Sequence, residues 1–264
     1  MISSLKHYLG VYRYFVTTSV SEALSFRTSF ILLVLMDIFF YFSVLFSVDF
    51  LFDHMQTIGP WNRYQLLFFI CFMLNIDTIH MGVFSSNFWM LGFKIRTGEL
   101  DFDLLKPTHS IFICFFRYLK PSSLLTAPVA WGLLIYYGSK IGLLWYDWLL
   151  IPPLLLLGLS LLCVLEFILC TSMFWLVEGM GINFLRMQMQ QMARWPDFIY
   201  KYTYQKIFTI GVPLLLIGSG PVHFILDKSN WHYLAGMCLA IVISTLILVK
   251  IWNKALRQYD SASS

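Results

Sequence analysis

Six long apolar stretches dominate the sequence and decide what the chain can fold into. A helix needs about 20 apolar residues to cross the hydrocarbon core of a bilayer. Backbone groups inside lipid must pair within the spanning structure, and the stretches lack the short alternating pattern of a membrane β-barrel. The sequence therefore predicts an all-α, polytopic membrane protein with about six transmembrane helices. The stretches cover approximately residues 28–52, 64–86, 114–137, 148–176, 205–226 and 231–251.

The composition excludes a soluble protein. Hydrophobic residues make up 59% of the 264 positions and charged residues 12%. A soluble domain is about one quarter charged, so this chain has too little charge to coat a water-exposed surface. The 5 cysteines show no CxxC pair and no Cys/His cluster. We therefore expect free thiols packed as small apolar groups, with neither a disulfide framework nor a metal site.

The basic residues predict the orientation of the helices. With the N-terminus inside, 13 of the 18 Lys and Arg fall on the cytoplasmic side and 3 fall outside, which favours cytoplasmic termini. No cleavable signal precedes the first stretch, so we expect that stretch to be retained. Arg117 and Lys120 lie inside the third stretch, and the outer set is Arg63, Lys140 and Lys228. The cytoplasmic set is Lys6, Arg13, Arg27, Lys94, Arg96, Lys106, Arg186, Arg194, Lys201, Lys206, Lys250, Lys254 and Arg257.

Three larger pieces outside the stretches are predicted to be cytoplasmic: residues 1–27, about 88–110 and about 178–204. The first reads as an amphipathic helix, lying in the inner-leaflet interface or packed on the underside of the protein. The third contains a run of helix formers, 185–196, that predicts a linker helix at the interface. The apolar face of the first helix comprises Leu5, Tyr8, Leu9, Tyr12, Val16 and Val20.

The 88–110 loop combines dense charge of both signs with an apolar stripe of Leu100, Leu104 and Leu105. This pattern predicts a short amphipathic helix that begins after Gly98 and is ended by Pro107. Such a helix could lie on the membrane, on this subunit or in the groove of a partner. The segment of interest is Gly98, Glu99, Leu100, Asp101, Leu104, Leu105, Lys106 and Pro107.

Carboxylates inside the apolar stretches are candidates for a transport pathway, since ionisable groups in lipid are costly and face the protein interior. The deepest are Asp37, Asp77 and Glu166. They could serve a substrate or proton path, or they could pair with cations on neighbouring helices; no tight acid–histidine relay is evident from their spacing. Pro213 and Pro221 break the fifth stretch, as in transport proteins whose broken helices line a cavity.

Catalytic motifs are absent from the sequence. It has no GxxxxGK[ST] phosphate loop, no HExxH and no GxSxG. Active transport would therefore need ATP hydrolysis by another chain, or ion coupling through the membrane carboxylates, as in a secondary transporter. A membrane enzyme acting on lipids would need a cluster of nucleophile, base or metal ligands, and none is visible. Nucleic-acid binding has no support.

Taken together, these features resemble the bacterial branch of the type 2 ATP-binding-cassette export permeases, the ABC-2 family. The resemblance covers nearly the whole chain, although Arg117, Lys120 and Pro121 interrupt the third stretch. The motifs that carry it are Gly98-Glu99-Leu100-Asp101, Leu104-Leu105-Lys106-Pro107, Trp195-Pro196, Pro213, Pro221, Trp252 and Ala255-Leu256-Arg257-Gln258-Tyr259-Asp260-Ser261-Ala262.

The resemblance implies a permease subunit in the bacterial inner membrane, with the 88–110 loop seated on a separate ATP-binding-cassette ATPase. It implies two permease chains, identical or related, per two ATPases. ATP and magnesium would bind in the partner subunit, and this chain would hold no cofactor. The substrate does not carry over, because the family exports drugs, lipids and glycoconjugates. The domain plan is residues 1–27 as the interfacial helix, 28–251 as the transmembrane domain and 252–264 as a cytoplasmic tail.

Overall fold

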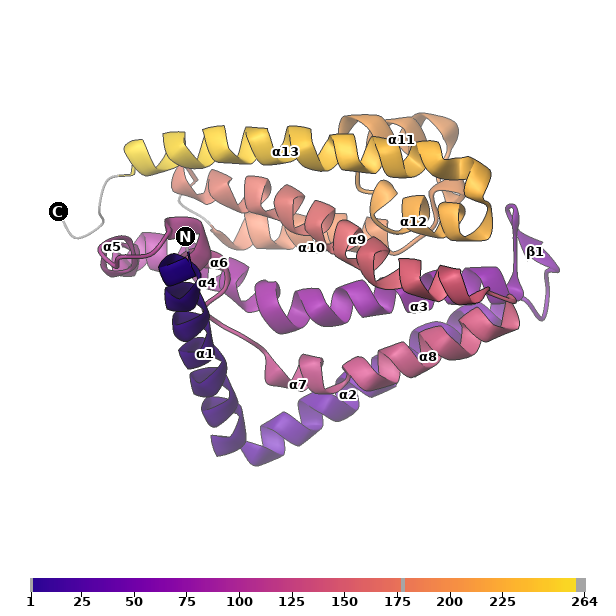
Figure 1. The fold of residues 1–264 in the computed structure, drawn as a ribbon, viewed down its shortest axis with the longest axis horizontal. Helices are drawn as coiled ribbons and strands as arrows, with labels where there is room; N and C mark the ends of the chain where they lie inside the picture. Colours follow the sequence, from indigo (N-terminus) through magenta and orange to yellow (C-terminus); the bar gives the residue numbers. More distant parts are fainter. Residues whose placement is uncertain (1, 177–178, 260–264) are drawn as a thin grey trace.

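Helices form almost all of the regular structure (Figure 1). The structure, a computed structural model, describes residues 2–176 and 179–259. The all-α prediction is confirmed, apart from a two-stranded hairpin of β1 (Thr57–Ile58) and β2 (Trp61–Asn62). The α-helices are α1 (Ile2–Ser25), α2 (Arg27–Leu51), α3 (Arg63–His80), α4 (Ser86–Thr97), α5 (Glu99–Leu104), α6 (Ser110–Phe115), α7 (Pro121–Leu125), α8 (Ala127–Lys140), α9 (Trp145–Thr171), α10 (Gly179–Ala193), α11 (Tyr202–Lys206), α12 (Leu216–Leu226) and α13 (Trp231–Arg257). The shorter π and 3-10 elements are η1 (Met81–Ser85), η2 (Ser172–Phe174), η3 (Asp197–Ile199), η4 (Ile207–Gly211) and η5 (Lys228–Asn230).

Four helices within the described residues are long and apolar enough to cross a membrane. A fifth candidate is the pair Tyr202–Gly211 and Leu216–Leu226, which is bent by 100°. These elements match five of the six predicted stretches, so the prediction of about six spans is confirmed only in part. The four helices are Arg27–Leu51, Arg63–Thr97, Trp145–Phe174 and Lys228–Arg257.

The long helix α3–η1–α4 lies at the centre of the bundle. In its most apolar window 83% of the residues are buried, against 17% in the windows of α2 and α13. It packs against α8, α9, α12 and α2, while α13 packs on the far side of α9. The outer helices α2 and α13 therefore expose most of their apolar side chains, as expected for helices in contact with lipid.

The third predicted stretch differs from a single helix, because the chain between α6 and α7 is extended. Pro121 begins α7, and the residue before a proline is disfavoured in a helix. The exposed backbone groups still find partners. The Lys120 N–H donates to the Gly82 carbonyl at 2.8 Å, and the Asn87 amide exchanges hydrogen bonds of 2.8 and 2.9 Å with the backbone of Tyr118. The break is thus stabilised by η1 and α4, and α8 is left with only 14 residues.

Residues 179–198 form the largest departure from the sequence prediction. The start of α10 is in close contact with α4, since a Cβ on Gly92 would lie 3.2 Å from the Gly179 Cα. At the other end, the rings of Phe198 and Trp61 are 4.9 Å apart. This segment therefore runs antiparallel to α3–η1–α4 for nearly its full length. The predicted helix of 185–196 is confirmed over most of its length as part of α10, which buries one face against the bundle and exposes the other; its place at the membrane interface stays a prediction.

The start of α1, the end of α13 and α5 lie at one end of the bundle (Figure 1). On the N-terminal side, Tyr8 packs on Phe112 at 5.0 Å and accepts a hydrogen bond from the His109 N–H. On the C-terminal side, Trp252 donates to the Ser110 hydroxyl at 3.0 Å. The hairpin lies at the opposite end, as does the ion pair between Lys228 and Asp147 at the start of α9.

Helix α1 runs across the end of the bundle instead of along it (Figure 1). Tyr8 and Tyr12 of its predicted apolar face pack on α6, whereas Leu9, Val16 and Val20 are exposed. Contact with the protein and an open apolar face therefore coexist, and the membrane contact stays a prediction. The Leu5 side chain and the tail 260–264 lie outside the described residues.

Replacing Asn87 by leucine tests the account of the broken stretch. The change leaves the backbone N–H and C=O of Tyr118 without hydrogen-bond partners, and each unsatisfied group costs about 1–3 kcal/mol. We expect the melting temperature of the detergent-solubilised protein to fall by about 4–8 °C, measured by scanning fluorimetry. Asn253→Leu, the same substitution on the exposed face of α13, is the control. Equal melting temperatures for the two variants would contradict the role given to Asn87.

Candidate functional site

The segment after α4 has the helix that its sequence predicts. Gly98 ends α4 with φ 75°, a left-handed conformation that glycine adopts without steric cost, and α5 follows directly. The apolar side chains of α5 point in two directions. Leu100 is fully buried against the chain itself and Leu104 is half-buried, whereas Phe102 and Leu105 are 71% and 82% exposed. Glu99, Lys106 and Pro107 are also exposed, and Asp101 is half-buried.

A buried carboxylate fixes α5 to the end of α4. Asp103 is 2% exposed and binds the ammonium groups of Lys94 and Lys106, both at 2.6 Å, and the Arg117 guanidinium at 2.9 Å. Burial alone would raise the pKa of Asp103, but the hydrogen bonds from Lys106 and Lys94 and the charge of Arg117 hold it below its usual value. Arg117, which the sequence places inside the third stretch, thus belongs to the α5 anchor, defined here as Asp103 with its three cations.

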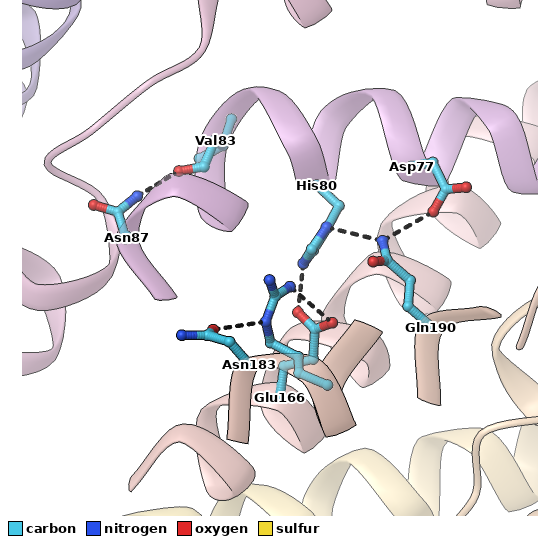
Figure 2. Close-up of polar contacts among 8 residues, drawn as sticks. Asp77, His80, Val83, Asn87, Glu166, Asn183 and Gln190 are labelled. Carbon is cyan, nitrogen blue, oxygen red and sulfur yellow. Dashed lines mark hydrogen bonds and ion pairs between the residues drawn. The ribbon is translucent and has the colours of Figure 1, made fainter. Parts of the chain in front are cut away.

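A second polar cluster lies in the middle of the bundle, among α3, α9 and α10 (Figure 2). Glu166 accepts hydrogen bonds from His80, at 2.5 Å, and from Arg186, at 3.4 Å. All three side chains are at most 1% exposed. The Arg186 guanidinium also lies over the Phe88 ring, 4.9 Å from its centroid. A histidine N–H and a guanidinium thus compensate this buried carboxylate on two sides.

The cluster continues along α10 to Asp77. Gln190 donates to Asp77 at 3.1 Å and contacts His80 Nδ1 at 3.2 Å, and Arg194 Nε donates to Asp77 at 2.7 Å. Because Gln190 supplies the proton to Nδ1, the His80 ring carries its own proton on Nε2 and donates it to Glu166. The result is an unbroken polar chain: Arg194, Asp77, Gln190, His80, Glu166, Arg186 and Asn183.

Asp37 lies apart from this chain, on α2. It accepts a hydrogen bond from Ser123 at 2.9 Å and lies 3.7 Å from the Lys120 ammonium. The same carboxylate lines a groove between α2 and α10 whose other walls include Arg186 and Arg194. The structure therefore brings Asp37 and the polar chain to one groove.

Pro213 and Pro221 lie elsewhere. Pro213 is at the bend between η4 and α12, beside a pocket formed with α13, and Pro221 is buried inside α12. Neither lines the groove between α2 and α10. The bend itself is held to η3, because Asp197 binds His223 of α12 at 2.9 Å.

The pairing interpretation of the three carboxylates agrees with the structure, since each lies near a cation on another element. The sequence did not predict the His80–Glu166 contact, or that Arg186 and Arg194 bind the carboxylates of Glu166 and Asp77. One signal was present: Arg186, Gln190 and Arg194 recur every four residues and so share one face of a helix. Among the described residues, no group of three His, Cys, Asp or Glu side chains could hold a metal ion.

The comparisons with known proteins fit this architecture. A family model described as "ABC-2 family transporter protein" matches residues 28–263. No curated protein and no solved structure matches the chain. With nearly the whole chain matched and several membrane-spanning helices present, the protein belongs to the ABC-2 transporter family, the membrane permeases of ATP-binding-cassette exporters.

Proposed function

We propose that the chain is the permease subunit of an exporter driven by ATP hydrolysis in a separate subunit, and that this ATPase docks on α5. The observation that carries the proposal is the α5 geometry. A short helix at the end of the bundle exposes Phe102 and Leu105 while its other side is tied to α4 through Asp103. Exposed aromatic and aliphatic side chains on a fixed support are typical anchors of an interface.

The anchors differ from the stripe that the sequence suggested. Leu100 is covered by the chain's own residues and Leu104 is half-covered. Leu105 keeps the predicted role and Phe102 joins it. The charged residues Glu99 and Lys106 lie beside these two side chains and would adjust orientation and salt dependence more than affinity.

The proposal includes six crossings, with α10–η3 as the fifth. Its supporting observation is that residues 179–198 run beside α3–η1–α4 from the α5 end to the hairpin. The bent pair of α11–η4 and α12 then enters and leaves the bundle on the hairpin side. The crossings are α2, α3–η1–α4, α7–α8, α9, α10–η3 and α13.

This topology still favours a cytoplasmic α5 end. Arg186 and Arg194 move into a crossing, and Lys201 and Lys206 move outside. Arg117, part of the α5 anchor, joins the cytoplasmic side, so that ten basic residues lie inside and five outside. Both termini would face the cytoplasm of a bacterium, below the inner membrane. ATP and magnesium would bind the partner ATPase, and a second permease chain would complete the exporter.

Labelling at position 201 distinguishes the proposed topology, in which residue 201 lies outside, from the sequence prediction, in which it is cytoplasmic. In a cysteine-free background, Lys201→Cys should react with a membrane-impermeant maleimide added to intact cells, because residue 201 follows η3 at the hairpin end. Lys140→Cys is the control for outside labelling and Lys254→Cys for protection inside; all three side chains are exposed. Protection of position 201 would restore the cytoplasmic assignment of 178–204.

The docking of α5 is tested by Phe102→Ala/Leu105→Ala. If both side chains are buried against the ATPase, their removal costs about 3 kcal/mol or more, which weakens binding by roughly a hundredfold or more. We expect the ATPase to be lost on copurification and transport to fall at unchanged expression. The control is Phe50→Ala/Leu51→Ala, which removes the same two kinds of exposed side chain at the hairpin end of α2. It should change neither copurification nor transport. Normal copurification and transport by the α5 variant would exclude α5 as the docking element.

The α5 anchor gives a prediction for pH. Because the folded pKa of Asp103 is lowered, its stabilising contribution is complete above the ordinary carboxyl value of about 3.9 and is lost only as pH falls below it. Copurification of the ATPase should therefore not vary through Asp103 between pH 5 and 8.

Asp103→Asn should weaken copurification throughout that range, since it leaves the Lys94 ammonium buried without its carboxylate. Adding Lys94→Met removes the stranded charge and should restore much of the loss. A double variant as weak as Asp103→Asn alone would show that the pair does not hold α5 in place.

A further inference from the structure

Three adjoining pockets lie along the bundle, the last two beside α10. The first, between α1, α2 and α4, is mainly apolar and has Trp89 in its wall. Trp89 also lines the second, the groove between α2 and α10. That groove shares Phe40, Gln191 and Arg194 with the third pocket, which extends toward Ile70 of α3. The pockets thus form a series from the α1 end of the bundle toward the hairpin end, in which Arg186, Gln191 and Arg194 lie among largely apolar walls.

The groove and the third pocket contain hydrogen-bond donors that have no partner within the part of the protein that the structure describes. Arg194 donates only its Nε–H to Asp77, and its two terminal amino groups have no hydrogen-bond partner among the described residues. Gln191 lines both the groove and the third pocket, and its side chain makes no hydrogen bond to the described part of the chain. A guanidinium offers five donors in a planar fork that matches a carboxylate or phosphate.

The acidic groups near these donors are already engaged. Asp77 is bound by Arg194 and Gln190, Glu166 by His80 and Arg186, and Asp37 lies beside Lys120. The fixed charges are therefore close to balance, and the remaining capacity is for acceptors. An acceptor-rich group fits the groove, while a bare cation would meet guanidinium groups.

We propose that this groove, lined by Arg186, Gln191 and Arg194, binds the acidic head group of an amphiphile whose acyl or other apolar part lies against the apolar walls of the adjoining pockets. The head group is a carboxylate or a phosphate. Trp89 and Phe40, which lie at the junctions between pockets, provide apolar contacts next to the charge. This inference rests on the proposed export function and names the substrate class of that permease.

The test uses the purified full-length chain in nanodiscs and three fluorescent probes of equal acyl length. One carries a carboxylate, one a phosphate monoester and one a phosphocholine, and binding is followed by fluorescence anisotropy. We expect at least one acidic probe to bind at least tenfold more tightly than the phosphocholine probe. The preferred acidic probe identifies the acid.

Gln191→Glu places a carboxylate among the donors without removing an existing contact. It should weaken the acidic probe at least tenfold and leave the phosphocholine probe unchanged. Gln188→Glu, the same substitution one turn earlier on an exposed position outside the groove, should have no effect. Equal affinities for acidic and phosphocholine probes, or equal effects of the two variants, would overturn the inference.

Binding is measured without the ATPase, so the two proposals fail separately. Selective binding by a chain that never copurifies with an ATPase would refute the proposed function and leave the acidic site intact. Copurification and ATP-dependent transport by a chain that shows no preference for acidic probes would refute the site alone.

Discussion

Paired charges on α10 constrain the helices around it. Arg186 is 1% exposed, and an uncompensated guanidinium at that depth would be strongly destabilising. The helix can lie inside the bundle only with its polar face toward Asp77, His80 and Glu166, which come from α3 and α9. Because α10 touches both helices through these side chains, their separation and rotation are fixed by hydrogen-bond geometry as well as by apolar packing.

The same requirement explains which crossings could be predicted from the sequence. The helices α2, α3–η1–α4, α9 and α13 are long and apolar enough to cross a membrane, so length and hydropathy identify them without knowledge of their neighbours. Helix α10, a crossing only in the proposed topology, fails such a test, since it has 15 residues and carries Arg186, whose cost the test assigns without the carboxylate that compensates it. The apolar stretch 205–226 passes the test but bends by 100°. Hydropathy measures how strongly a segment favours apolar surroundings, and either lipid or the protein interior can provide these. It therefore does not show whether an apolar stretch crosses the membrane.

Local sequence patterns predicted the start of α5 correctly, but they did not predict which of its side chains are exposed. Gly98 and the following charges identify a helix start, and the structure has one there. Which leucine faces outward depends on what else approaches the helix. Lys94 and Arg117 converge on Asp103, and this turns Leu100 inward and leaves Phe102 outside. Arg117 comes from a segment whose extended shape is stabilised by Asn87, a contact between residues 31 positions apart that no local pattern reveals.

A single long helix links the two polar clusters. Lys94, which holds Asp103 of α5, and Asp77, which binds α10, belong to the same element, α3–η1–α4. Between them lies the π-helix η1, a local widening that is often found at functional sites. Its Gly82 carbonyl is bound to the extended segment before α7, so α8 is tied to the same point. A force applied to α5 by an ATPase would therefore act on α10 and on the groove through paired charges and continuous helix, with the π-helix as the place along that path where the helical hydrogen bonding changes.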